Sequence, residues 1–201
     1  MLRLIQFTIK DEYMLHKSLK RGIVGSLGLL LFIGCAGGGP KLSDEVKLKI
    51  NESTKYKINN VKVALSTINP ADESKQSLYP SETEVASLIK ENLTSYLKRE
   101  DLLCTTVNCI DVDVNMDYAR QFILKSNSVS VPRYSYTVLI KDNEKVLLTK
   151  DSKDKTLETG FTRNLKIIAS VGSDKVNKED EVEDMEKILI YIKMYIKSLS
   201  R

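Results

Sequence analysis

The sequence predicts an α+β fold, a two-layer sandwich in which two main helices cover one face of a mostly antiparallel sheet. Three observations support this prediction. Residues 110–118 alternate strictly between apolar and polar side chains, as in a strand with one wet face. Residues 81–97 and 179–199 each carry an apolar stripe at helical spacing. Residues 133–149 contain two strand-like runs separated by a short polar turn, as in a hairpin.

The first half of the expected domain contains a strand, a helix and a second strand. The first strand covers residues 56–65, where Val61, Val63 and Leu65 would share one face. The helix begins after Ser81, because Ser81 and Glu84 have the spacing of a capping box. Its apolar stripe consists of Val85, Leu88, Ile89, Leu93, Tyr96 and Leu97.

The second half supplies the hairpin and the final helix. Residues 150–155 are expected as a charged loop. Leu165, Ile167, Ala169 and Val171 fit a further strand, and a helix over residues 160–171 is the alternative. The acidic run 179–184 suits a helix N-terminus, where the helix dipole favours anions, and the helix is expected to end near Lys197. The predicted order is therefore β-α-β-β-β(-β)-α.

The N-terminal 34 residues have the pattern of a secretory signal peptide. Basic residues precede an apolar segment at residues 23–33, which is too short for a membrane span of about 20 residues. Met14 is the expected true start, because Asp11 and Glu12 upstream of it fit poorly in the basic region of a signal. Residues 1–34 are therefore not part of the predicted fold.

The end of this segment, Phe32-Ile33-Gly34-Cys35, resembles the lipobox of bacterial lipoproteins, although Phe32 stands where leucine is usual. The resemblance implies that Cys35 is acylated and becomes the mature N-terminus. Ala36 after the cysteine implies the outer membrane of a Gram-negative bacterium, with the protein facing the periplasm. A plain signal peptide with a coincidental cysteine is the alternative. Residues 35–55 would form the anchor and a glycine-rich flexible tether, and residues 56–201 a single domain.

Composition excludes several classes of function. Five of the 31 basic and two of the 27 acidic residues lie in residues 1–34, which leaves 26 basic and 25 acidic residues and no nucleic-acid-binding basic tract. The single histidine, His16, lies in the same segment. The mature chain therefore lacks histidine for acid–base catalysis and for most zinc sites. We expect no enzymatic activity, no cofactor, no bound metal and no nucleic-acid partner.

The remaining two cysteines, Cys104 and Cys109, are separated by four residues. A spacer of this length allows the two Cα atoms to approach within the distance that a disulfide requires, and a periplasmic location is oxidising. We predict a disulfide; a redox or metal-binding pair is the alternative.

Asp111, Asp113, Asn115 and Asp117 share one face of the second predicted strand. Their spacing matches the start of a calcium-binding EF-hand loop, but the required glycine is Met116. A flat row of carboxylates cannot enclose an ion alone. We interpret it as a solvated face, with a docked cation or basic partner as the alternative.

Two further groups are candidate protein interfaces. Tyrosine and arginine are enriched at interfaces, and they cluster at Tyr118, Arg120, Arg133, Tyr134 and Tyr136. Ordinary cross-strand packing is the alternative. The second group, Ile190 and Met194, falls opposite the main stripe of the last helix and among lysines, so it could meet a partner or a membrane surface.

The layout of residues 56–199 is similar to that of small envelope lipoproteins of the YajG kind and of auxiliary lipoproteins of transport systems, which share the order of lipobox, strand, long helix, strand, hairpin and terminal helix. This resemblance implies a non-catalytic accessory or interaction protein of the envelope with a protein partner. A periplasmic lipoprotein that binds a small ligand or lipid between sheet and helices is the alternative. An apolar pocket would favour the ligand hypothesis, and a packed core with an exposed apolar patch would favour the interaction hypothesis.

The anchor hypothesis predicts the effect of Cys35→Ser. This substitution removes the acylated thiol, so the protein should move from the membrane fraction to the soluble periplasmic fraction. Fractionation and immunoblotting measure the change. Retention of the variant in the membrane would contradict the lipid anchor.

Overall fold

The computed structural model describes residues 42–69, 76–106 and 109–200. The predicted signal peptide, Cys35 and the glycines after it lie outside these residues. The described elements are the helices α2 (Asp44–Lys49), α4 (Glu82–Arg99), α5 (Phe161–Ala169) and α6 (Lys178–Leu199) and the strands β1 (Tyr56–Ile68), β2 (Ile110–Gln121), β3 (Arg133–Asp142) and β4 (Lys145–Thr156).

The four strands form one sheet in the order β1-β2-β3-β4. Strands β1 and β2 are parallel, and α4 connects them, as a parallel pair requires a long crossover. The β2–β3 and β3–β4 pairs are antiparallel. The predicted hairpin is confirmed, and Asn143 in its turn has φ +54°, a conformation that asparagine tolerates. The sheet is therefore mostly antiparallel, as predicted.

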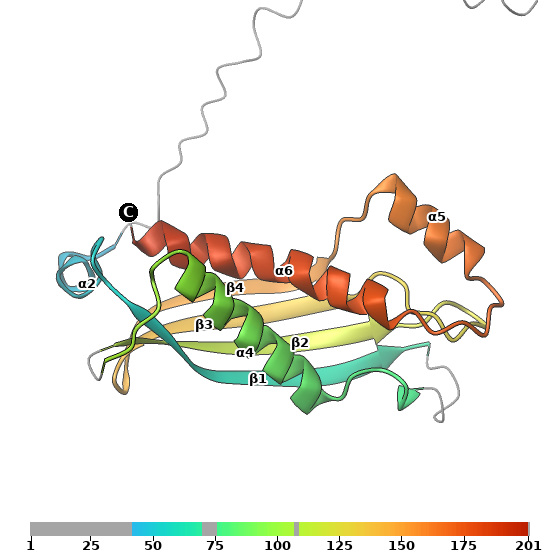
Figure 1. The fold of residues 1–201 in the computed structure, drawn as a ribbon, viewed down its shortest axis with the longest axis horizontal. Coiled ribbons are helices and arrows are strands. Elements are labelled where there is room, and N and C mark those ends of the chain that lie inside the picture. The colour runs from blue at the N-terminus through green and yellow to red at the C-terminus, as the bar shows by residue number, and fades with distance from the viewer. Residues whose placement is uncertain (1–41, 70–75, 107–108, 201) are drawn as a thin grey trace, which may run out of the picture. The chain divides into compact units, whose positions relative to one another are not determined.

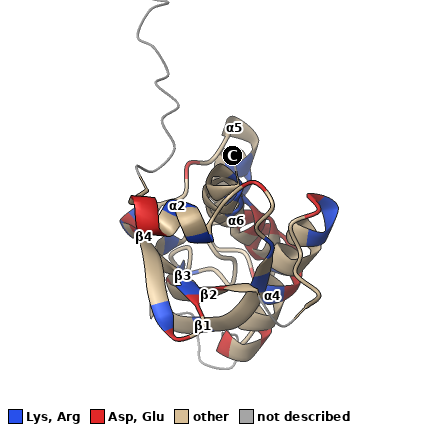
Figure 2. Cartoon of the chain, turned by 90° about the vertical axis from the view of Figure 1, so that its left-hand side faces the viewer, with Lys and Arg blue, Asp and Glu red and all other residues tan. Residues whose placement is uncertain are grey.

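Helices α4 and α6 cover the same face of the sheet (Figures 1 and 2). The capping box at the start of α4 is present: the Ser81 hydroxyl accepts from the Glu84 amide at 3.3 Å, and the Glu84 carboxylate accepts from the Ser81 amide at 2.7 Å. The buried side of α6 contains the stripe that its sequence predicts, namely Met185, Ile188, Leu189, Ile192, Ile196 and Leu199. The α+β two-layer prediction is confirmed.

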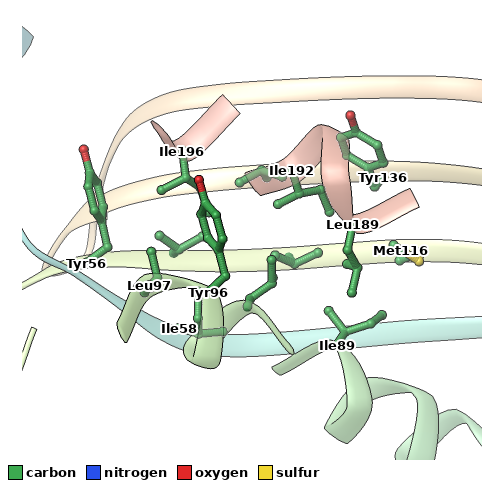
Figure 3. Close-up of a cluster of buried hydrophobic side chains, with 14 of the residues drawn as sticks. Tyr56, Ile58, Ile89, Tyr96, Leu97, Met116, Tyr136, Leu189, Ile192 and Ile196 are labelled. Carbon is green, nitrogen blue, oxygen red and sulfur yellow. The ribbon is translucent and has the colours of Figure 1, made fainter. Parts of the chain in front are cut away.

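The core lies between this helical layer and the sheet. The strict alternation in β2 places Ile110, Val112, Val114, Met116 and Tyr118 in the interior, where they meet residues of α4 and α6. Figure 3 shows how the side chains of both layers fill this space. Its fully buried members include Tyr56, Ile89, Leu93, Leu97, Ile188 and Ile192.

The prediction that residues 35–55 form an anchor and flexible tether is wrong for the described part of this range. Residues 44–49 form α2, and Val46 and Ile50 join the main core cluster. Leu42, Val46 and Ile50 are spaced by four residues, which places them on one side of a helical turn. The pattern is hard to recognise in the sequence because many charged residues lie between them. The Ser43 side chain caps this helix by accepting from the Val46 amide at 3.4 Å.

One further expectation was wrong, and one alternative that the sequence left open is decided by the structure. Residues 150–155 belong to β4 and do not form a loop, since β4 continues to Thr156. They lie at the sheet edge, where charged side chains are common because they discourage pairing with another sheet. Of the strand and the helix that the sequence left open after residue 160, the structure has the helix: residues 161–169 form α5, and Gly160 is its N-cap residue.

Cys104 and Cys109 form a disulfide, as predicted, with their Cα atoms 5.8 Å apart. The bridge closes part of the segment that leads from α4 into β2. Next to it, the Tyr56 amide donates to the Leu102 carbonyl at 2.8 Å and the Cys104 amide donates to the Tyr56 carbonyl at 2.9 Å. The α4–β2 connection is thus attached to the start of β1.

The docked position of α2 predicts a contrast between two neighbouring residues. Ile50 is 3% exposed, whereas Leu48 is 82% exposed. Ile50→Ala should lower the free energy of unfolding by about 2–4 kcal/mol, and Leu48→Ala should change it by less than about 0.5 kcal/mol. Urea unfolding monitored by circular dichroism measures both. Equal effects of the two substitutions would show that α2 is not packed on the domain.

Candidate functional site

The acidic row of β2 lies on the face of the sheet opposite the helices, but its members differ in environment. Asp113 is 6% exposed. Its carboxylate accepts from the Lys141 ammonium at 2.5 Å and from the Asn59 amide group at 3.2 Å. Asn115 and Asp117 are exposed and border an open polar hollow of about 230 Å³. The row is therefore partly neutralised by cross-strand pairing.

The described ranges contain no group of three or more His, Cys, Asp or Glu residues arranged to hold a metal ion. The β2 backbone stays extended from Ile110 to Gln121. An extended strand cannot wrap around an ion as an EF-hand loop does. Also within the described ranges, no helix has both the length and the apolar character needed to cross a membrane.

The tyrosine–arginine cluster is mostly interior. Tyr118 pairs with Tyr134 across β2 and β3, and Tyr134 stacks on Tyr136 with ring centroids 6.3 Å apart. These three tyrosines and Arg120 are buried, whereas Arg133 is exposed. Burial raises the pKa of the Tyr118 phenol well above its usual value. The cluster is thus placed as cross-strand packing would place it, not as an open docking surface.

Arg120 forms a buried ion pair with Glu181 of α6. Its Nε donates to Glu181 Oε1 at 2.7 Å and its Nη2 to Glu181 Oε2 at 3.2 Å, which is a two-point contact. Nη2 also donates to the Pro80 carbonyl at 2.8 Å, and the guanidinium lies 5.1 Å from the ring centroid of Tyr79. Arg120 therefore joins β2, the start of α6 and the segment before α4.

A second buried arginine joins α5 to α6. Arg163 Nη1 donates to Asp180 Oδ2 at 2.6 Å, and Nη2 donates to Asp184 Oδ2 at 2.9 Å. Arg163 is the single buried residue of α5. Lys166, one turn later, pairs with Asp180 at 3.2 Å. These charges hold α5 to the rest of the domain.

The pKa values of the three acidic partners do not all shift in the same direction. Burial raises the pKa of Glu181, and the hydrogen bond and charge of Arg120 offset it only in part. Burial likewise raises the pKa of Asp184, with a partial offset from Arg163. For Asp180, burial also acts upward, but the hydrogen bond from Asn177, the charge of Arg163 and the hydrogen bond and charge of Lys166 together outweigh it, so its pKa is lowered.

Sequence reasoning missed this ion-pair cluster. A signal was present, because Glu181 lies four residues before Met185 and Asp184 lies four before Ile188, on the side of α6 that is apolar elsewhere. Acidic residues in a buried stripe require basic partners. The sequence does not say which of the many arginines and lysines those partners are.

A groove of about 540 Å³ lies between the outer sides of α4 and α6. Tyr96 lies in it, with the Arg99 guanidinium 5.5 Å and the Lys193 ammonium 5.7 Å from its ring centroid. Ile190 lines the groove and is 49% exposed; Met194, one turn further, is 64% exposed. These two residues are exposed as the sequence predicts. The remaining lining residues are Leu88, Glu91, Asn92, Ser95 and Glu186.

The space between sheet and helices, where a small ligand was the alternative hypothesis, is occupied by side chains (Figure 3). A cavity of about 110 Å³ lies between α4 and α6 near Pro80 and is bordered by Val85, Met185 and Glu181. Ligand sites usually have volumes of about 300–1,000 Å³. Both carboxylate oxygens of Glu181 are bound by Arg120, so this side chain has a structural role here.

The raised pKa values predict a pH dependence of stability. A carboxyl group with a higher pKa in the folded state keeps its proton over a pH window above its unfolded pKa. The contribution of that group to the free energy of unfolding therefore falls as pH rises from about 4 through that window. We expect Glu181→Gln to flatten this part of the profile, as measured by urea unfolding in pH steps between about 4 and 7.

Glu183→Gln on the exposed side of α6 is the matched control. The hydrogen bond and charge of Lys187 lower the pKa of Glu183. Its stabilising contribution is therefore present above the unfolded value and lost only as pH falls below about 4. A Glu181→Gln profile that runs parallel to the parent between pH 4 and 7 would contradict the raised pKa of Glu181.

Comparison with known proteins gives distant structural similarity. No protein-family model matches the chain, and no curated protein matches it either. A solved structure from Helicobacter pylori, described as a homologue of a neuraminyllactose-binding hemagglutinin, has 10% identity and a TM-score of 0.36, and the match covers 76% of this chain and 93% of that one. Rare lipoprotein B from Shewanella oneidensis has 11% identity and a TM-score of 0.23, with 71% and 100% coverage.

Proposed function

We propose that this chain is a non-catalytic accessory protein of the bacterial envelope, lipid-anchored at Cys35 and facing the periplasm, that docks a protein partner in the α4–α6 groove. One observation carries the proposal: Ile190 and Met194 are exposed beside this groove, although α6 has a complete buried stripe on its other side. A helix needs only one apolar stripe to pack on a sheet. The second strip is therefore available for a partner.

The groove indicates the chemistry of that partner. Its apolar surface comes from Leu88, Tyr96 and Ile190, and charges of both signs flank it. Glu91 and Glu186 are acidic, whereas Arg99 and Lys193 are basic. A helix or extended segment with a few apolar anchors and mixed charges at its edges fits such a surface. A nucleic acid would require a predominantly basic one.

The absence of catalysis is supported by the residues available for it. The single histidine lies in the predicted signal peptide, and Glu181 and Asp184, whose pKa values are raised, are paired with arginines. The envelope location is supported by the signal-like segment and the lipobox resemblance at Cys35. These features favour an interaction protein over a hydrolase that uses paired carboxylates.

In-cell photo-crosslinking tests the docking surface. A photoreactive amino acid at position 190 or 194 should give one reproducible protein adduct that mass spectrometry can identify. The same amino acid at position 48, which is 82% exposed on α2, is the matched control and should not give that adduct. A charged substitution at the neighbouring apolar position, such as Met194→Glu with the probe at 190, should abolish the adduct.

The outcomes separate the hypotheses. An adduct of equal yield from position 48 would contradict a specific groove. Loss of the protein adduct together with capture of a lipid or small molecule at position 190 would favour the ligand-binding alternative. Because Met194 is exposed, Met194→Glu should leave the urea midpoint nearly unchanged, which separates lost docking from lost folding.

A further inference from the structure

Helix α5 has its apolar side turned to solvent. Phe161 is 77% exposed, Leu165 49%, Ile168 68% and Val171, just after the helix, 63%. The spacing of four, three and three residues places these side chains along one stripe, which we call the α5 stripe. A surface helix normally buries such a stripe. Figure 1 shows α5 standing apart from the layer formed by α4 and α6.

The buried side of α5 is charged. Arg163 lies among Asp180 and Asp184 of α6, at 2.6 and 2.9 Å. These ion pairs fix the rotation of α5 about its axis, because Arg163 follows Phe161 by two residues and so points away from the α5 stripe. The ordinary amphipathic arrangement is thus reversed: the cation faces inward and the apolar side chains face outward.

The segment after α5 is also fixed to the domain. The Ser173 carbonyl accepts from the Asn127 amide at 3.1 Å and from the Ser126 hydroxyl at 2.9 Å. The Ser128 hydroxyl donates to the Lys175 carbonyl at 2.6 Å. The helix therefore has a defined position at its C-terminal end as well as at Arg163, and the stripe is presented outward by the fold itself.

Charge and size indicate what the stripe contacts. Arg163 is buried in its ion pairs and is not available to a membrane. In residues 161–178 the exposed charged residues are three lysines, Lys166, Lys175 and Lys178, and one acidic residue, Asp174. Short apolar stripes flanked by lysine and arginine bind the interface of anionic bilayers. A stable protein interface buries about 800 Å² on each partner, which is more than four partly exposed side chains offer. The α5 stripe suits a lipid surface better than a second copy of the chain.

We propose that α5 is a membrane-contacting helix whose stripe enters the headgroup region of an anionic bilayer. This inference rests on the proposed function in one respect, the lipid at Cys35 that holds the chain at a membrane. Helix α2, which follows the predicted tether, lies at the other end of the sheet from α5 (Figure 1). Contacts at both ends orient the domain on the membrane and present the α4–α6 groove in a fixed direction.

Site-specific fluorescence on the acylated full-length chain tests the inference. With Cys104 and Cys109 in a disulfide and Cys35 acylated, a new cysteine is the only reactive thiol. Ile168→Cys, carrying an environment-sensitive dye, is reconstituted into vesicles of phosphatidylethanolamine and phosphatidylglycerol. Its emission should shift to shorter wavelength and be quenched by lipids with brominated acyl chains. Thr162→Cys is the matched control, because Thr162 is exposed on the same helix but off the stripe, and its dye should report water.

Two results would overturn the membrane contact of α5, and a third tests the lipid anchor at Cys35 separately. Equal emission from dyes at 168 and 162 in vesicles would show that the stripe does not meet the bilayer. A shift at 168 that appears in solution as protein concentration rises would indicate a second copy instead. The parent chain without a new cysteine should take up no dye; uptake at Cys35 would refute the lipid anchor and is read independently of the α5 result.

Discussion

Two carboxylates that α6 carries into the interior constrain much of the remaining structure. Glu181 and Asp184 lie on the buried side of this helix, where an unpaired charge would cost several kcal/mol. Each is met by an arginine from another element, Arg120 of β2 and Arg163 of α5. The first pair attaches the start of α6 to the sheet, and the second attaches α5 to α6. Helix α5 contributes no other buried side chain, so its position depends on electrostatics and not on hydrophobic packing.

This constraint explains the reversed amphipathicity of α5. Because Arg163 must face Asp180 and Asp184, the stripe that includes Phe161 and Ile168 faces solvent. The helix is thus held by ion pairs and, after its C-terminal end, by hydrogen bonds to the Ser173 and Lys175 carbonyls. Its apolar side chains are left available for a membrane or another surface. A helix that packed on the domain through its apolar stripe would bury that stripe and could not expose it to a membrane.

The two faces of the domain have different characters. On the outer face of the sheet, the acidic row lies along the extended backbone of β2, and its most buried member, Asp113, is paired with Lys141. On the helical side, α6 adds a second apolar strip at Ile190 and Met194 beside the α4–α6 groove, and α5 adds its own stripe. Both of these apolar strips lie on helices or directly after one, and the proposed contacts with a partner and a membrane lie there.

The sequence by itself determined the regular elements that local pattern and capping specify: the alternating strand β2, the capped helix α4, the hairpin and the apolar stripe of α6, as well as the Cys104–Cys109 pair. Only the tertiary structure decided the rest. Helix α2 docks through Val46 and Ile50, and β4 extends through charged residues because β3 supplies its hydrogen-bond partners. Residues 161–169 form a helix whose one buried residue, Arg163, lies among carboxylates of α6. The choice of Arg120 and Arg163 as partners likewise depends on which side chains the fold brings together. Such pairings are long-range, and residue patterns along the chain do not contain them.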